Sequence, residues 1–413
     1  RRPALRRSRV ARITFTFLTT SPYPLSVSSF SCSLIRYLKS SAFSPEELER
    51  GAVPGGRGRP GFSRRHSQPS RGGMAGGLGE LWREGREPVP LYRTDLGAAY
   101  LGDALELLRG LRDGSVDLVL TSPPYPLQRE KEYGRPASED EFVDWFMPFA
   151  REVKRVLKDS GSFVLDLGSV YVKGRPVKSI YNYRLLVRLV DELGFVMPQE
   201  FFWYNPSRLP APIEWVNKRK LRVKDSVNTI WWLSKSDYPK VRVERVYIEY
   251  SDRMKLLLKL RERFYRPKER PSGHDISGRF MELPPDKGAI PPNLLVIPNT
   301  DSNSRFLRLC RELGAKPNPT RFPEELPEFF IKMLTDPGDV VLDIFAGSNT
   351  TGYVAEVLGR RWLAFEINRE YLAASAIRFA RDDGEARRIY EALKGGAANL
   401  YVPSTLQGLN PFS

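Results

Sequence analysis

The chain has 413 residues, which is enough for two or three domains on length alone. Its formal net charge is +16, but residues 1–73 carry 14 basic and 3 acidic side chains, and residues 206–290 carry 20 basic and 11 acidic ones. The rest of the chain is slightly acidic, so the sequence predicts an ordinary compact protein with one basic surface for a polyanion. A solvated charged face is the alternative explanation of that basic segment.

Cysteine and histidine are too scarce for a disulfide framework or a zinc site. The chain has two cysteines, Cys32 and Cys310, and two histidines, His66 and His274. We therefore expect no metal and a protein of the reducing cytoplasm. The apolar stretches near residues 13–18 and 25–34 are too short and too interrupted to span a membrane.

The first 73 residues are rich in Arg, Ser, Pro and Gly and show neither a helical nor a strand period. We interpret them as a disordered tail or as an over-extended reading frame whose true start is Met74. A transit peptide is the alternative, because such leaders are rich in Arg and Ser and poor in acids.

From residue 94 onward, short apolar runs alternate with helical patterns. An entry strand and a helix around residues 105–111 are predicted within 94–112, and a buried strand is predicted at 116–120. A helix then begins with the capping-box pair Ser138 and Glu141 and is stopped by Asp159-Ser160-Gly161. The elements expected next are a strand at 162–167, a helix at 185–193, and strands at 196–204 and 228–233.

The pattern breaks between residues 234 and 290, where the chain is basic and carries several prolines. It resumes with predicted strands at 294–297, 340–344 and 362–365 and predicted helices at 327–334, 351–358 and 371–379. The tail after Ala397 is expected at the surface, and Trp231 and Trp232 are expected in the core or at a sheet edge. Alternating strands and helices predict an α/β fold with a mostly parallel sheet.

The stretch Thr121-Ser122-Pro123-Pro124-Tyr125 directly follows the predicted buried strand at 116–120. Two prolines cannot continue a central strand, so the chain must leave the sheet here in a stiff turn. The turn brings a hydroxyl, a free carbonyl and an aromatic ring together at the edge where α/β sheets place their sites. Such a polar clamp beside an aromatic plate suits a flat heterocycle with an exocyclic amino group.

A second candidate site is the small-residue turn at 343–352, which follows a predicted strand and opens a helix. Small residues allow close approach of a ligand, and the helix N-terminus offers free N–H groups to a carboxylate or phosphate. Glu366 ends the next strand, as does the acid that binds ribose hydroxyls in nucleotide-binding folds. The turn lacks the dinucleotide fingerprint and the lysine of a Walker-type loop, so S-adenosylmethionine fits better than a dinucleotide. A tight connection without a ligand is the alternative.

Thr-Ser-Pro-Pro-Tyr at 121–125, followed by Phe-Ala-Gly-Ser at 345–348, resembles the beta class of amino-group DNA methyltransferases, in which the catalytic motif precedes the cofactor motif. Serine at the first clamp position resembles the cytosine-N4 branch found in type II restriction–modification systems. Further stretches across residues 92–380 resemble one methylase of that branch. The resemblance implies a Rossmann-like S-adenosylmethionine-dependent fold that is circularly permuted, with helices on both faces of the sheet. Its expected parts are a catalytic half at 90–234, a basic target-recognition region at 235–290 and a cofactor-binding half at 291–397.

The resemblance also implies roles for individual residues. Ser122 and Pro123, with Pro124 beside them, would hold the target amino group; Tyr125 would stack on the extruded base, and Asp166 would assist Ser122. Without the resemblance, a loop-capping role for Asp166 would be the better explanation. The residues expected to bind the cofactor are Asp343, Phe345, Ala346, Gly347, Ser348, Asn349, Glu366, Asn368, Phe322 and Pro323.

Asn349 departs from the family pattern, because many relatives have a glycine at that position. Asn tolerates the left-handed conformation, so we expect the turn to survive. The residues expected to meet DNA are Lys255, Arg261, Arg263, Arg266, Ser272 and His274. Contacts of the basic ones with phosphates would position the duplex without specifying its sequence.

The sequence thus predicts a prokaryotic, cytoplasmic, site-specific methyltransferase that acts on cytosine N4 in double-stranded DNA with S-adenosylmethionine as methyl donor. It would protect that DNA from a cognate restriction endonuclease, which would be a functional rather than a physical partner. Methylation of adenine N6 by the same fold is the first alternative. A catalytically inactive DNA-binding protein on this scaffold is the second.

Overall fold

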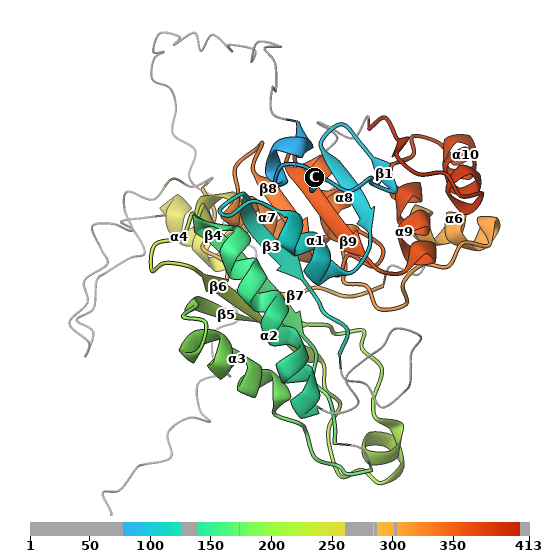
Figure 1. The fold of residues 1–413 in the computed structure, drawn as a ribbon. Coiled ribbons are helices and arrows are strands. Elements are labelled where there is room, and N and C mark those ends of the chain that lie inside the picture. Colours follow the sequence, from blue (N-terminus) through green and yellow to red (C-terminus); the bar gives the residue numbers. More distant parts are fainter. Residues whose placement is uncertain are drawn as a thin grey trace, which may run out of the picture. The chain divides into compact units, whose positions relative to one another are not determined.

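The computed structural model describes residues 77–125, 139–172, 174–260, 284, 287–300 and 304–404. Contacts divide the chain into two units, Arg1–Gly72 and Gly73–Ser413, and the fold is that of the second (Figure 1). The predicted tail at 1–73 and the capping residue Ser138 lie outside the described residues.

The described residues form a ten-stranded sheet in the order β10-β1-β2-β9-β8-β3-β4-β6-β5-β7. Neighbouring strands are parallel except for the pairs β1–β2, β4–β6 and β5–β6, so the predicted α/β fold with a mostly parallel sheet is confirmed. The strands are β1 (Tyr92–Arg93), β2 (Gly97–Leu101), β3 (Val116–Thr121), β4 (Leu157–Leu167), β5 (Val196–Tyr204), β6 (Val227–Ser234), β7 (Leu294–Val296), β8 (Val340–Asp343), β9 (Arg361–Glu366) and β10 (Leu400–Tyr401).

Helices cover both faces of the sheet (Figure 1). One face carries α1 (Ala104–Gly110), α2 (Glu139–Val156) and α3 (Tyr181–Asp191). The other face carries α6 (Arg305–Leu313), α7 (Glu325–Leu334), α8 (Thr350–Val357), α9 (Arg369–Ser375) and α10 (Asp383–Lys394). A further helix, α4 (Asp252–Leu260), contributes to a small separate cluster with Tyr250 and Ala289.

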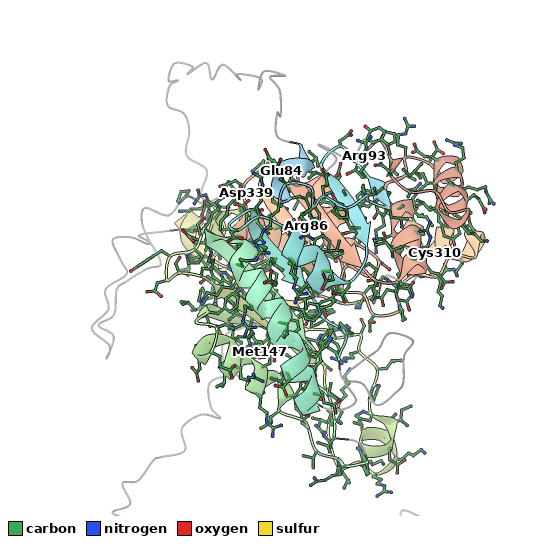
Figure 2. The ribbon with its side chains drawn as sticks, viewed as in Figure 1. Glu84, Arg86, Arg93, Met147, Cys310 and Asp339 are labelled. Carbon is green, nitrogen blue, oxygen red and sulfur yellow. The ribbon has the colours of Figure 1, made fainter. Side chains whose placement is uncertain are left out.

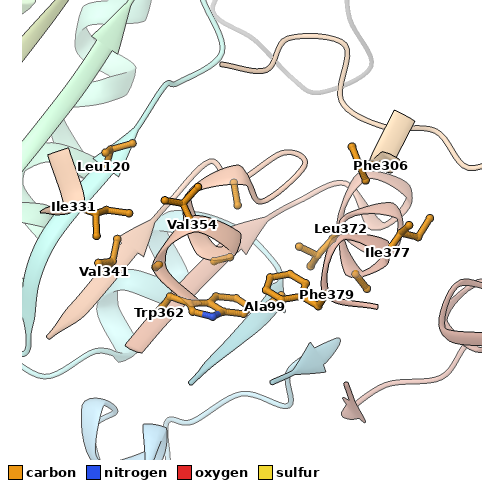
Figure 3. Packing of buried hydrophobic residues seen from close by; sticks show 14 of the residues in the cluster. Ala99, Leu120, Phe306, Ile331, Val341, Val354, Trp362, Leu372, Ile377 and Phe379 are labelled. Carbon is orange, nitrogen blue, oxygen red and sulfur yellow. The ribbon is translucent and has the colours of Figure 1, made fainter. Parts of the chain in front are cut away.

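Successive side chains of the central strands point to opposite faces of the sheet and so enter two different hydrophobic cores. In β3, Leu118 and Leu120 enter the core under α7 and α8, whereas Val119 enters the core under α2. Val341 of β8 belongs to the first of these cores, together with Val354 of α8 (Figure 3). Trp231 and Trp232 are 0% and 7% exposed, which confirms the first of the two expected positions, the core.

The central pair of strands joins parts of the chain that are far apart in sequence. β3 lies beside β8 in parallel, with Leu118 opposite Val341 and Val119 opposite Leu342. Because parallel strands end at the same edge of a sheet, the predicted clamp after β3 and the predicted turn after β8 emerge side by side.

Several element boundaries differ from the prediction. α2 ends at Val156, and Asp159-Ser160-Gly161 lies inside β4, which begins at Leu157 because that residue pairs with Val116. The tail is not merely surface: β10 pairs with β1 at one edge of the sheet, and Val402 is buried.

Helices α6 and α10 were not predicted. The signal for α6 was present, because Ser304 caps its first turn and Gly314 ends it in the left-handed conformation. Cys310 lies on α6 and is buried (Figure 2), and burial raises the pKa of its thiol to about 11. None of the helices within the described ranges is both long and apolar enough to cross a bilayer.

The contact between β2 and β9 depends on a glycine. A Cβ atom at Gly97 would come within 2.1 Å of the indole ring of Trp362, which is completely buried. The ring cannot turn away easily, because its Nε1 donates a 2.6 Å hydrogen bond to the buried carboxylate of Glu356. The same carboxylate accepts a hydrogen bond from Thr94 Oγ1 at 2.7 Å.

We expect Gly97→Ala to lower the free energy of unfolding by about 1–3 kcal/mol, because the added methyl group overpacks this contact. Denaturant unfolding measures the loss, and Gly77→Ala is the matched control because a Cβ there meets no atom within 4 Å. The loss should shrink when Gly97→Ala is made in a Trp362→Leu background. Equal stability of the Gly97→Ala and Gly77→Ala variants would contradict this account of the packing.

Candidate active site

A pocket of about 410 Å³ opens at the carboxyl ends of β3, β4, β8 and β9. The predicted clamp contributes Ser122, Pro123, Pro124 and Tyr125, and the predicted turn contributes the other wall. The two candidate sites found in the sequence therefore form one continuous cavity.

The clamp residues and Asp166 form a compact polar cluster. Ser122 Oγ lies 3.0 Å from the phenol oxygen of Tyr125. Both hydroxyls donate to Asp166 Oδ2, at 3.3 Å from Ser122 and 3.4 Å from Tyr125. Asp166 stands near the end of β4, the parallel neighbour of β3, which is why Ser122 and Asp166 meet although they are 44 residues apart in the sequence. The carboxylate lines the pocket beside the clamp rather than capping a loop elsewhere.

The second oxygen of Asp166 is fixed by residues that the sequence did not single out. Asn228 on β6 donates from Nδ2 to Asp166 Oδ1 at 3.2 Å. Arg208 in turn donates to Asn228 Oδ1 at 2.9 Å, which orients the amide so that its NH₂ group faces Asp166. Burial raises the pKa of Asp166 to about 6, although the hydrogen bonds from Asn228, Ser122 and Tyr125 act in the opposite direction.

The ring of Tyr125 rests on a glycine. A Cβ atom at Gly168 would come within 2.7 Å of that ring, so only glycine leaves the ring its present place. Tyr181 donates to the carbonyl of Gly168 at 2.8 Å and fixes this part of the backbone. Burial raises the pKa of Tyr125 well above its ordinary value, so the phenol keeps its proton and remains a donor.

Asp343 connects the clamp to the turn. Its Oδ1 accepts a hydrogen bond from Thr121 Oγ1 at 2.7 Å and one from the Phe345 amide at 3.1 Å. Its Oδ2 accepts from Thr351 Oγ1 on α8 at 2.7 Å. Burial raises the pKa of Asp343 to about 6, and the three donors offset part of the cost of burying the carboxylate.

The turn depends on two residues in the left-handed conformation. Gly347 has φ +54°, and a Cβ there would come within 2.4 Å of the side chain of Asn318. Asn349 has φ 49°, as the sequence allowed, and its Oδ1 caps α8 by accepting from the Gly352 amide at 3.1 Å. Its Nδ2 donates to the phenol oxygen of Tyr92 at 2.9 Å, so Asn349 also ties the turn to β1.

Glu366 faces the turn from the end of β9 and lines the pocket. Its Oε2 accepts a hydrogen bond from the Gly347 amide and its Oε1 accepts one from the Asn368 amide, each at 2.8 Å. Burial raises the pKa of Glu366. The carboxylate is thus held at a fixed position on the pocket wall.

The residues predicted to bind the cofactor fall into two groups. Those that line the pocket are Asp343, Phe345, Ala346, Ser348, Glu366 and Phe322. The others support the wall from behind: Gly347 and Asn349 shape the turn, Asn368 caps α9, and Pro323 is buried just before α7.

An aromatic wall of the pocket was not foreseen. Trp145 of α2 stacks on Phe345, with ring centroids 5.7 Å apart and planes inclined by 30°. Trp145 and Phe149 both line the cavity, and Phe149 also belongs to the core under α2. No local pattern marks them as pocket residues, because their contact with Phe345 arises from the packing of α2 against the end of β8.

The residues predicted to meet DNA are mostly outside the described part of the chain: Arg261, Arg263, Arg266, Ser272 and His274. Lys255 is described and lies on α4, where it forms a 2.8 Å ion pair with Glu249 and does not line the pocket. Within the described ranges, no group of three or more His, Cys, Asp or Glu side chains could hold a metal ion.

Comparison with known proteins agrees with this geometry. Residues 116–377 match the family model described as DNA methylase, N6_N4_Mtase. The chain is 56% identical to the type II methyltransferase M.PvuII of Proteus hauseri over 290 residues, which are 70% of this chain and 85% of that relative. It is 27% identical to the type II methyltransferase M.BglII of Bacillus subtilis over 285 residues, 69% of each chain.

A solved structure extends the comparison to the fold. The PvuII DNA methyltransferase, described as cytosine-N4-specific, matches with a TM-score of 0.61 and 44% identity, over 77% of this chain and 98% of that one. This is the methylase that the stretches across residues 92–380 resemble, so the predicted resemblance is confirmed. The clamp precedes the turn in the sequence, and both line one pocket. Together with the match to the family model, this shows that the chain belongs to the N6/N4 family of DNA methylases.

Proposed function

We propose that the protein transfers a methyl group from S-adenosylmethionine to the exocyclic N4 of cytosine in double-stranded DNA, at specific sites, within a restriction–modification system. The observation that carries the proposal is the cluster of Ser122, Tyr125 and Asp166, which shares one pocket with the turn after β8. The identity to M.PvuII over 85% of that relative supports the same activity.

The chemistry of the pocket fits S-adenosylmethionine. Glu366 presents a fixed carboxylate that can accept hydrogen bonds from a ribose diol. The start of α8 beside Ser348 and Asn349 offers helix N-terminal dipoles to a carboxylate. Phe345 and Phe322 supply aromatic surface for a purine. When bound, the cofactor supplies an electrophilic methyl group on a positively charged sulfur.

The clamp overcomes the poor nucleophilicity of an aromatic amine, whose lone pair is delocalised into the ring. Hydrogen bonds from the amino group to Ser122 Oγ and to the carbonyl of Pro123 favour a pyramidal nitrogen with its lone pair exposed. The clamp and the turn lie on adjacent strand ends, which fixes the approach of nitrogen and methyl group. Such positioning can supply about 7–11 kcal/mol of the barrier reduction.

Asp166 is the acceptor for the proton that the methylated nitrogen must lose. It already accepts hydrogen bonds from both clamp hydroxyls, and Asn228 keeps its other oxygen occupied. A carboxylate whose pKa is raised to about 6 is a better base than an exposed one and remains ionised at neutral pH.

The pocket is recessed at the sheet edge, so a base inside a duplex cannot reach it. The target base must leave the stack, at a cost of roughly a few kcal/mol. Tyr125, fixed over Gly168, offers the extruded base an aromatic plate in exchange. Cytosine is preferred to adenine because the first clamp residue is Ser122, whereas an acid or Asn would suit the adenine enzymes.

The test is to methylate duplex DNA in vitro with labelled S-adenosylmethionine and to weigh the nucleosides after complete digestion. N4-methylcytosine is the expected product. N6-methyladenine alone would refute the choice of base and favour the adenine alternative. No transfer to any duplex would favour the inactive DNA-binding protein.

Ser122→Ala should lower kcat by roughly 100-fold while cofactor affinity stays unchanged, because the variant loses one of the polar groups that hold the amine. Single-turnover methyl transfer and calorimetric binding of the cofactor measure the two effects. Ser115→Ala makes the same change just before the start of β3 and should leave both quantities as in the wild type. Full turnover by Ser122→Ala would remove Ser122 from the mechanism.

The pH profile of kcat should fall on the acid side of about pH 6, where Asp166 takes up a proton and can no longer accept one. Asp166→Asn should lower turnover at pH 8 by roughly 100-fold and remove that acid limb from the profile. An Asp166→Asn variant that keeps the wild-type acid limb would assign it to another group.

Asp166 also predicts a pH-dependent stability. Its pKa rises from the ordinary 3.8 to about 6 on folding, so its unfavourable contribution is absent below about pH 4 and complete above about pH 6. The stability advantage of Asp166→Asn over the wild type should therefore grow by about 3 kcal/mol from pH 3 to pH 7. Asp159→Asn, at a fully exposed side chain, is the control. A constant difference across this range would contradict the burial of an ionised Asp166.

A further inference from the structure

The segment between β5 and β6, residues 205–226, leaves the sheet as a separate projection, which we call the arm. β5 and β4 run in the same direction, because both are antiparallel to β6. The arm therefore leaves the sheet at the carboxyl edge, where the pocket opens. Figure 1 shows it as the yellow-green projection that ends in a short helical turn, Glu214–Lys218.

The arm is basic, and the charges at its far end face solvent. It carries six basic residues and two acidic ones, Glu214 and Asp225. Lys218, Arg219 and Lys220 form a consecutive exposed run at its far end. Apolar side chains are exposed beside that run, with Val223 85% exposed. The basic residues are Arg208, Lys218, Arg219, Lys220, Arg222 and Lys224.

Contacts at its base brace the arm. The guanidinium of Arg222 lies 4.0 Å from the ring centroid of Tyr171, and the phenol of Tyr171 donates to Asp225. Lys224 Nζ donates to the carbonyl of Arg208 at 3.1 Å and so closes the arm on itself. These side chains hold the arm in shape. The run 218–220 lies at the surface, where Lys218 and Arg219 share one carboxylate, that of Glu214, at 3.4 and 2.8 Å. The run therefore keeps an excess of positive charge that faces solvent.

The arm also reaches the reacting groups. Asn205 and Arg208 at its base line the pocket, and Arg208 holds Asn228, which in turn holds Asp166. A duplex that contacted the arm would therefore lie beside the opening through which its base must enter.

The basic residues just after β6 are placed differently. Lys240 forms ion pairs of 2.5 Å with Asp339 and 3.5 Å with Asp117, which lie at the amino ends of β8 and β3. Asp339 is labelled in Figure 2 at that opposite end of the sheet, and α4 with Lys255 lies toward the same end in Figure 1. The basic side chains of residues 240–260 thus form ion pairs within the protein or lie away from the pocket.

We propose that the arm is a DNA-docking surface, whose run Lys218-Arg219-Lys220 contacts backbone phosphates next to the extruded base. The proposal rests on the function proposed above and names the surface through which the duplex is held. Such contacts position the duplex and do not read its sequence. They release condensed counterions, so each makes binding more dependent on salt, with a slope of about 0.9 per phosphate.

The test compares Lys218→Gln/Arg219→Gln/Lys220→Gln with Arg387→Gln/Arg388→Gln/Lys394→Gln, which removes the same charge from exposed positions of α10. Binding of a labelled duplex that the wild type methylates is measured over a range of salt concentrations, with S-adenosylhomocysteine present so that no methyl is transferred. The arm variant should lose at least tenfold in affinity, and its salt slope should fall by about 1–3. The α10 variant should match the wild type, and both variants should bind S-adenosylhomocysteine normally.

An arm variant with the wild-type slope would overturn the proposal, as would an α10 variant that loses as much as the arm variant. A wrong assignment of the docking surface can be told apart from a wrong assignment of the function. In the first case the wild type still methylates duplex DNA, and in the second it methylates none.

Discussion

The site depends on one buried carboxylate, that of Asp343. It accepts hydrogen bonds from Thr121 at the end of β3, from Thr351 in α8 and from the backbone of the turn between them. The 222 residues that separate Asp343 from Thr121 are spanned by the pairing of β8 with β3. Because methyl transfer requires donor and acceptor in line, a shift between these strand ends would cost activity even with every reacting group intact.

Rigid strands carry the remaining groups. Asp166 stands on β4 and Asn228 on β6, and the amide of Asn228 is itself oriented by Arg208. Tyr125 is confined by Gly168, which leaves no room for a side chain. The site is thus organised before any ligand binds, with supporting residues that lock the reacting ones. Burial of Asp166 raises its pKa to about 6; this burial costs stability, and it would make the carboxylate a better proton acceptor in the proposed reaction.

Local signals in the sequence predicted the two motifs and the central strands. The prolines after β3 and the glycine turn after β8 act within a few residues, so their effect could be foreseen. Gly168, Arg208 and Asn228 could not be foreseen, because their importance arises from strand neighbours rather than sequence neighbours. The count of charges over residues 206–290 treated two separate surfaces as one. The arm lies at the carboxyl edge of the sheet, whereas residues 235–260, which follow β6, lie toward the amino edge. The missed helix α6 is different, since its cap residues Ser304 and Gly314 were visible in the sequence.

The central claim is that clamp and turn act as one site on a base outside the helix. A crystal structure of the protein with S-adenosylhomocysteine and a duplex containing its methylation site tests this most directly. We predict an extruded cytosine against Tyr125, with its amino nitrogen within hydrogen-bonding distance of Ser122 Oγ and the Pro123 carbonyl, and the cofactor sulfur facing that nitrogen from the turn after β8. A target base that stays stacked in the duplex, or a cofactor bound away from Glu366, would contradict the account.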